Sequence, residues 1–150
     1  MPTKTDELRE LIAKLKDGNL VKRVAENSLY NATASLTSYA KKNHKFKTRT
    51  AVLENATIFD VKGLTSTIFI NEKRAPYGPF IYEGTRDHEI VPKDAQALSW
   101  VQGNARFFSK GHKVKGIKAE PYILNAYNKR KRQFIKQFRN DMTEELQDAL

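Results

Sequence analysis

The spacing of the apolar residues changes twice along the chain, and these changes constrain the fold more than any other feature of the sequence. Between Leu20 and Ala40 the apolar residues recur at every third or fourth position, which predicts an amphipathic helix of about six turns. In residues 51–71, β-branched and aromatic residues alternate with their neighbours on both sides of a Lys-Gly step at 62–63, which predicts a β-hairpin. From Pro121 onward the helical spacing returns and predicts a second long helix.

The C-terminal helix is the clearest of the predicted elements. Pro121 suits its first turn, where the missing N–H of proline costs nothing. The apolar stripe of this helix consists of Leu124, Tyr127, Phe134, Phe138, Met142, Leu146 and Leu150. We expect Phe138 to be buried in the core, together with Trp100 on a short strand.

The predicted elements come in the order helices, strands, helix. We interpret this order as an α+β fold in a single domain, residues 1–150, with an antiparallel sheet that contains the hairpin. The long N-terminal amphipathic helix precedes the sheet, and the long C-terminal helix is expected to pack on it. Shorter strands are predicted at "EIVP", "ALSWV", "RFFS" and "HKVKG", and a short helix at residues 5–17 is expected to end at Gly18.

The chain has a net charge of +10, and most of the excess lies in three stretches. Residues 41–49, 106–118 and 129–139 together hold 16 of the 27 Lys and Arg residues and no Asp or Glu. Such clustering indicates nucleic acid, an anionic surface or an acidic protein as partner, unless the charges simply form a solvated face. The candidate contact residues are Lys110, Lys113, Lys115, Lys118, Lys129, Arg130, Lys131 and Arg132.

Other classes of site find little support in the sequence. There is no Cys and no close pair of His residues, so we expect no metal or cofactor site. The stretch "EGTRDHE" at 83–89 has the residue types of an acid–base loop, but it is strongly polar and no nucleophile motif accompanies it. We expect a structural corner rather than an enzyme, with its charges facing the solvent. The preceding residues 75–82 are expected to form a short helix or turn that opens at Pro76, is interrupted at Gly78-Pro79 and ends at Gly84. Tyr77, Phe80 and Ile81 or Tyr82 are expected to anchor it to the sheet. No apolar run is long enough to cross a membrane.

The stretch "APYGPFIYEGTRDHEIVPKDAQALSW" resembles the signature of a family of phage proteins. The matching residues are Ala75, Tyr82, Glu83, Gly84, Thr85, Ile90, Pro92, Ala97, Leu98 and Trp100. The later "PYILNA" is similar to the start of the family's last helix, and "TRTAVLENATIF" is similar to its step into the sheet, except that Ala51 stands where the family commonly has Gly. This family is the tail-completion, or minor tail, family of long-tailed phages, which includes the lambda minor tail protein Z.

The resemblance, which covers residues 20–140, implies a structural virion protein that completes the tail or joins it to the head, without enzyme activity. It implies a location at the head–tail junction of the virion, and in the host cytoplasm during assembly. Other neck and tail proteins, further copies of the chain in a ring and genomic DNA are the expected partners. Structural roles are implied for Tyr82, Glu83, Gly84, Thr85, Pro92, Trp100 and Pro121.

A basic nucleic-acid-binding domain is the alternative. Aromatic residues interleave with the positive charge at "HKFK", "RFFSK" and "KRQFIKQFR", as a surface that stacks on bases requires. Against this alternative, Phe134 and Phe138 belong to the helical stripe. Phe107 and Phe108 are neighbours that face opposite sides of a strand, so only one of them is expected to be exposed.

Overall fold

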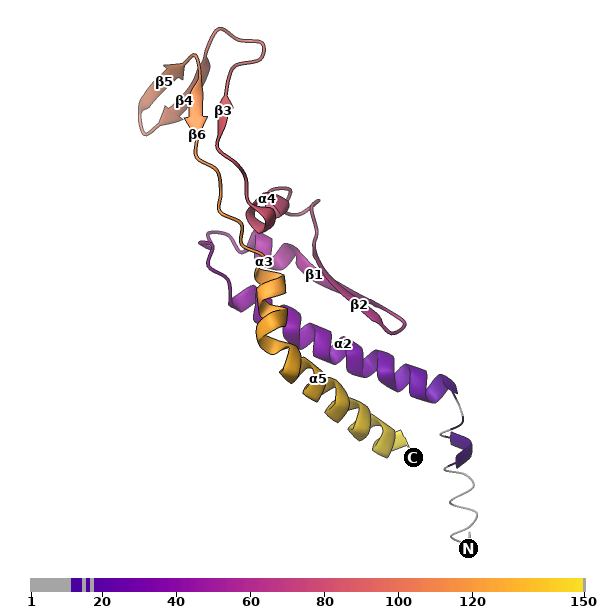
Figure 1. Ribbon diagram of the computed structural model, residues 1–150. Coiled ribbons are helices and arrows are strands. Elements are labelled where there is room, and N and C mark those ends of the chain that lie inside the picture. Colours follow the sequence, from indigo (N-terminus) through magenta and orange to yellow (C-terminus); the bar gives the residue numbers. More distant parts are fainter. Residues whose placement is uncertain (1–11, 15, 17, 150) are drawn as a thin grey trace, which may run out of the picture.

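The computed structural model describes residues 12–14, 16 and 18–149, which form a body and a protruding arm (Figure 1). The body contains the helices α2 (Gly18–Lys42), α3 (Val52–Ala56), α4 (Gly78–Glu83) and α5 (Tyr122–Ala149), and the strands β1 (Thr57–Lys62) and β2 (Thr65–Ile70). The arm, residues 84–119, contains β3 (His88–Ile90), β4 (Leu98–Gln102), β5 (Ala105–Ser109) and β6 (His112–Val114). The predicted α+β class is confirmed, whereas most of the helix predicted at residues 5–17 lies outside the described residues.

Helices α2 and α5 lie side by side and form the main layer of the body (Figure 1). The buried residues of α2 are Val24, Ala25, Ser28, Ala32, Thr33, Leu36, Thr37 and Ala40. Most of them are small, which allows close packing. The buried hydroxyl groups donate to carbonyls one turn earlier, Ser28 to Val24 at 2.8 Å and Thr37 to Thr33 at 2.8 Å, so their burial does not leave a donor without a partner.

Three predictions about the helices are wrong. Gly18 does not end a helix: it is the first residue of α2, and its φ is not positive. Helix α5 packs chiefly on α2 rather than on a sheet, because a hairpin of two strands is too narrow to cover a helix of 28 residues. Phe138 is half-buried rather than buried, because α2 is the element that α5 contacts most and it covers one side of the helix.

Strands β1 and β2 form the predicted hairpin. They are antiparallel, and Lys62 pairs with Thr65, so the loop consists of Gly63 and Leu64. Gly63 has a φ of 58°, and a glycine with positive φ at the first loop position matches the twist of the flanking strands. The described strands do not merge into the single sheet that the sequence suggested: β1–β2, β3–β6 and β4–β5 are three separate pairs.

Tyr122 ties the first turn of α5 to the hairpin. It is 1% exposed, and its hydroxyl oxygen lies 2.5 Å from Thr57 Oγ1. Because Thr57 donates its own proton to the Leu53 carbonyl at 2.9 Å, Tyr122 is the donor in this pair. The Tyr122 ring packs edge-on against Phe46 and Tyr82, with ring centres 5.3 and 5.9 Å apart. Burial raises the pKa of Tyr122.

Helix α4 closes the body at the point where the arm begins. Gly78 and Pro79 start this helix rather than interrupt it. Gly78 is buried, and a Cβ atom there would lie 2.6 Å from the side chain of Ile70. Gly84 ends the helix with a φ of 79°, as predicted.

The contacts of α4 with the core agree only in part with those expected. Tyr77 and Phe80 are exposed and do not anchor the turn. Ile81 and Tyr82 pack against the two core clusters, in agreement with the anchoring role expected of one of them, and Ala75 is buried. The helix therefore turns only one side to the body, and its aromatic residues at 77 and 80 lie on the solvent side.

The arm leaves the body as two extended segments joined by hydrogen bonds, which we call the stalk. The N–H of Thr85 donates to the Ile117 carbonyl at 2.8 Å, and the N–H of Ile117 donates to Thr85 Oγ1 at 2.9 Å. The N–H of Gly116 donates to Asp87 Oδ1 at 2.7 Å. A Cβ atom at Gly116 would lie 2.1 Å from the Thr85 carbonyl oxygen, so the two segments approach closely only because this residue is glycine. Strands β3 and β6 continue the pairing.

The end of the arm is a ribbon of two strands, β4 and β5 (Figure 1). Trp100 lies on the predicted short strand, but it is 39% exposed and not buried as predicted. Phe107 and Phe108 are both exposed, whereas only one was expected to be. The physical reason is common to all three residues: no described element forms a second layer over either face of the ribbon, and none of residues 84–119 is buried.

Candidate interaction surfaces

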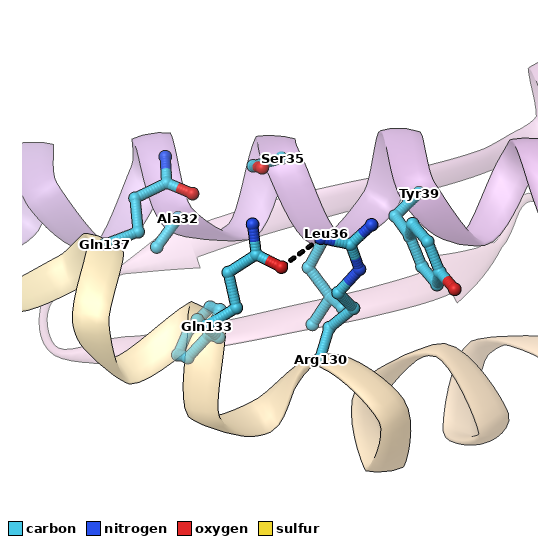
Figure 2. Close-up of a pocket in the computed structure, with 8 residues that line it drawn as sticks. Ala32, Ser35, Leu36, Tyr39, Arg130, Gln133 and Gln137 are labelled. Atoms are coloured by element: carbon cyan, nitrogen blue, oxygen red, sulfur yellow. Dashed lines mark hydrogen bonds between the residues drawn. The ribbon is translucent and has the colours of Figure 1, made fainter.

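The basic run at 129–132 does not form one surface. Consecutive residues of an α-helix point in directions about 100° apart. The guanidinium group of Arg130 lies toward α2, 4.1 Å from the centre of the Tyr39 ring, and hydrogen-bonds to Gln133 (Figure 2). Lys129, Lys131 and Arg132 are exposed. Arg130 is thus engaged in the contact between α2 and α5 by a cation–π interaction, and the other three remain on the surface.

The cavity beside Arg130 is too small for a ligand. It lies between α2 and α5 (Figure 2) and has a volume of about 20 Å³, which is room for about one water molecule. Its lining consists of Ala32, Ser35, Leu36, Tyr39, Arg130, Gln133, Phe134 and Gln137. This part of the helix pair is therefore a packing contact rather than a binding site.

Residues 41–49 divide their side chains between the core and the solvent. His44 stacks on Phe46, with ring centres 3.6 Å apart. His44 Nε2 also lies 3.2 Å from Glu54 Oε1, and both side chains are almost buried. The cationic residues Lys45, Lys47 and Arg49 are exposed. This stretch therefore presents positive charge outward while its aromatic residues support the core.

The four lysines predicted as contacts on the arm follow its second segment. Lys113 lies on β6 directly opposite Glu89 on β3. Lys110, Lys115 and Lys118 are exposed, as is Lys113. The pairing of β3 with β6 brings an acid beside the basic stretch, which the sequence of that stretch alone did not show.

Several residues of the phage-like signature meet at the root of the arm. A Cβ atom at Gly84 would lie 2.6 Å from the backbone nitrogen of Ala119, so glycine allows the chain to pass close to the second arm segment. Thr85 makes the hydrogen bonds of the stalk to Ile117. Tyr82 packs on the buried Tyr122.

The other signature residues lie apart from this root. Glu83 is the exposed last residue of α4. Pro121 directly precedes α5, and its carbonyl accepts a hydrogen bond from Asn125 N–H at 2.9 Å. Pro92 lies in the segment after β3, and Trp100 lies on the terminal ribbon. The signature is therefore split between the root of the arm, its far end and the start of the last helix.

The terminal ribbon exposes apolar side chains on both faces. Residues directly opposite in an antiparallel pair share a face, and neighbours along a strand alternate. Trp100 and Phe107 are opposite and stacked, with ring centres 5.8 Å apart, and His112 lies 5.8 Å from Trp100. The other face carries Val101 and Phe108, both exposed. We call Trp100, Val101, Phe107 and Phe108 the aromatic ribbon.

An open groove lies where residues 46–54 meet α4 and the second segment of the arm. Its volume is about 750 Å³. It is lined by Phe46, Lys47, Thr48, Arg49, Thr50, Ala51, Val52, Leu53, Glu54, Tyr77, Ile81, Ile117, Lys118 and Glu120. We call it the basic groove, because Lys47, Arg49 and Lys118 are its exposed cations. No sequence pattern predicted this groove, because only the fold brings residues of the 41–49 and 106–118 stretches together.

The charged corner at 83–89 faces the solvent, and one of its side chains forms a hydrogen bond within the arm. Glu83, Arg86, Asp87 and His88 are exposed, as expected, and Asp87 accepts a stalk hydrogen bond from Gly116. Within residues 12–14, 16 and 18–149, no group of three His, Asp or Glu side chains is placed to hold a metal ion. In the same part of the chain, no helix has the length and apolar character needed to span a membrane.

Comparisons of the chain with models of protein families, with curated proteins and with solved structures find no match. The resemblance to the phage tail-completion family therefore rests on the residues quoted for it from the sequence.

Proposed function

We propose that the chain is a structural protein of a long-tailed phage or prophage particle, which completes the tail or joins the tail to the head. The observation that carries this proposal is the arm, which has no buried residue and ends in the aromatic ribbon. A ribbon of two strands has little stability of its own, and exposed apolar patches mark surfaces that another molecule covers. An arm of this kind suits a protein that works by docking to its neighbours.

The backbone at Ala51 also supports the proposal. Ala51 has φ 54° and ψ 17°, in the left-handed region. Residues other than glycine rarely adopt this conformation, and the phage family commonly has Gly at this position. The chain therefore keeps the backbone geometry that the family pattern favours, although the residue differs.

The location and partners belong to the same proposal. The protein would lie at the head–tail junction of the virion, and in the host cytoplasm during assembly. Its partners would be other neck and tail proteins and further copies of itself in a ring. The corner at 83–89 is assigned a structural role, because its carboxylates lack the burial that acid–base catalysts commonly use and Asp87 holds the stalk.

Complementation of a phage that lacks this gene tests the proposal. Phe108→Asp places a charge on the aromatic ribbon, and Phe80→Asp is the matched control, because Phe80 is 57% exposed on the body and Phe108 is 66% exposed on the arm. We expect Phe108→Asp to fold normally but to leave free heads and free tails, whereas Phe80→Asp restores infectious particles. Lys113→Glu combined with Lys115→Glu should behave like Phe108→Asp. If all these variants complement as well as the wild type, the arm does not join particles.

Nucleic-acid binding is the second candidate function. The stacked pair of Trp100 and Phe107 lies close to His112. Two cationic residues, Arg106 and Lys110, lie on either side of Phe107 in the sequence. Bases that stack on exposed aromatic side chains gain about 1–3 kcal/mol each. Titration of the purified protein with a labelled single-stranded oligonucleotide at physiological salt separates the two candidates. Micromolar binding that Trp100→Ala weakens at least about fivefold would favour this second function, and no such binding is expected for a joining protein.

A further inference from the structure

We propose that the basic groove binds the acidic end of helix α5 from a second copy of this chain. The acidic end consists of Asp141, Glu144 and Asp148, which share one side of the helix because residues three and four apart are neighbours on its surface. Both surfaces belong to the same chain, so the contact requires only a second copy and none of the other proteins of a particle.

The rim of the groove carries uncompensated positive charge. Lys47, Arg49 and Lys118 are exposed, and none of them forms an ion pair with another described residue. Neighbouring cations of this kind create a positive potential that attracts an anionic partner. The floor between them includes Val52 and Ile117, both partly open to solvent.

The two carboxylates that line the groove are already engaged within the chain. Glu54 lies 3.2 Å from His44 Nε2 and accepts a hydrogen bond from the Thr48 hydroxyl. Glu120 accepts the backbone N–H of Lys45. These contacts hold both acids within the chain, so the exposed cations of the rim remain available to a partner.

The acidic end of α5 has the opposite character. Glu144 and Asp148 are exposed and Asp141 is half-buried, and none of the three is paired with a described cation. Glu145 differs, because it turns toward α2 and accepts a hydrogen bond from Asn27 at 3.2 Å. Acidic residues near the C-terminal end of a helix oppose its dipole, so helix stability does not explain their presence.

The groove and the acidic end of the same chain cannot meet. Glu120 lines the groove directly before α5, and Asp148 lies near the other end of this helix (Figure 1). At 1.5 Å per residue, the helix separates them by about 40 Å. The contact must therefore join two copies. If it is reciprocal, each acidic end fills the groove of the other copy in a two-fold dimer; if it is head to tail, one groove and one acidic end stay free. A head-to-tail contact repeats into a ring if its rotation closes and into a filament if it does not.

The apolar floor favours a protein helix over a nucleic-acid strand as the occupant. Val52, Tyr77 and Ile117 are apolar or aromatic side chains exposed in the groove. A protein helix offers carboxylates together with the aliphatic parts of its side chains, whereas a phosphate backbone offers charge but no apolar surface to cover this floor.

Charge reversal on the two surfaces tests the contact. One variant carries Lys47→Glu, Arg49→Glu and Lys118→Glu, and the other carries Asp141→Lys, Glu144→Lys and Asp148→Lys. A control carries Lys73→Glu, Arg74→Glu and Lys131→Glu at exposed positions outside the groove. Light scattering coupled to size exclusion at low salt gives the mass of each, against 17.2 kDa for one chain, and circular dichroism checks the fold.

We expect the wild type and the control to self-associate with increasing concentration, and each charge-reversed variant alone to remain a monomer. An equimolar mixture of the two variants should associate again, because each reversed surface then meets a surface of opposite charge. A wild type that stays monomeric, or variants that associate as it does, would overturn the proposal. A monomeric wild type whose groove variant alone loses binding to a single-stranded oligonucleotide would assign the groove to nucleic acid instead.

Discussion

The body and the arm contain similar residues but use them differently. In the body, Leu36, Leu53 and Tyr122 are buried between helices and the hairpin. In the arm, Trp100 and Phe108 lie on strands and are exposed. The difference is the number of layers, because an element buries its apolar face only against a second element. The buried aromatic residues of the body therefore stabilise the fold, whereas the exposed ones at the end of the arm are available to another molecule.

The largest effect on stability is expected in the body, at Tyr122. Tyr122→Ala removes a ring that packs on Phe46 and Tyr82 and leaves Thr57 without its hydrogen-bond donor. Truncation of a buried aromatic side chain costs about 3–5 kcal/mol. Urea unfolding followed by far-ultraviolet circular dichroism measures the loss. A loss of less than about 0.5 kcal/mol, as expected for an exposed side chain, would remove the distinction between the two regions.

The next effect is expected in the stalk, where it should be local. Gly116→Ala places a Cβ atom against the Thr85 carbonyl, and overpacking of this kind costs about 1–3 kcal/mol. We expect the amide of Ile117 to exchange its hydrogen faster while the amides of α2 are unchanged. Gly18→Ala is the control, because a Cβ atom at Gly18 would meet nothing within 4 Å. Equal acceleration in arm and body would show that the two regions unfold as one unit.

A smaller effect, confined to alkaline solution, is expected from Tyr122. Burial raises the pKa of Tyr122 above 10.0, and the carboxylates of Glu54 and Glu120 add to the shift. The folded chain then holds the phenolic proton more tightly than the unfolded chain, so this contribution is complete below pH 10 and is lost as the pH rises through the folded-state pKa. The free energy of unfolding should fall above pH 10 less steeply in Tyr122→Phe than in the wild type. Identical slopes would contradict the burial of this hydroxyl.

The smallest effect on stability is expected on the aromatic ribbon. Phe108→Ala removes an exposed side chain, and surface substitutions usually change the free energy of unfolding by less than about 0.5 kcal/mol. Urea unfolding should place this variant with the wild type. A loss of several kcal/mol would show that the ribbon packs against the body in solution.

Local patterns in the sequence predicted the helices and strands well, because the spacing of apolar residues in each kind of element follows from its backbone geometry. The long helix from residue 20, the hairpin around Gly63 and the four short strands were all predicted where they occur. Gly84 was predicted to end its helix, and its positive φ has this effect.

Burial and the candidate site could not be predicted in the same way, because both depend on which elements come together. Trp100 was predicted to be buried, but no second layer of described residues reaches its strand. Arg130 was grouped with its neighbours in sequence, whereas the turn of the helix directs it to Tyr39. The basic groove joins residues about 70 positions apart, such as Lys47 and Lys118, and no local pattern contains that contact.

Oxidative footprinting of Trp100, read by mass spectrometry, tests the central claim most directly. Trp100 is the single Trp of the chain, and the claim is that another component of the particle covers its face of the ribbon. We expect rapid oxidation of Trp100 in the isolated chain and strong protection in assembled particles, with Phe80 on the body as an exposed reference within the same molecule. Protection of Trp100 already in the isolated chain, or equal oxidation in both states, would contradict the account.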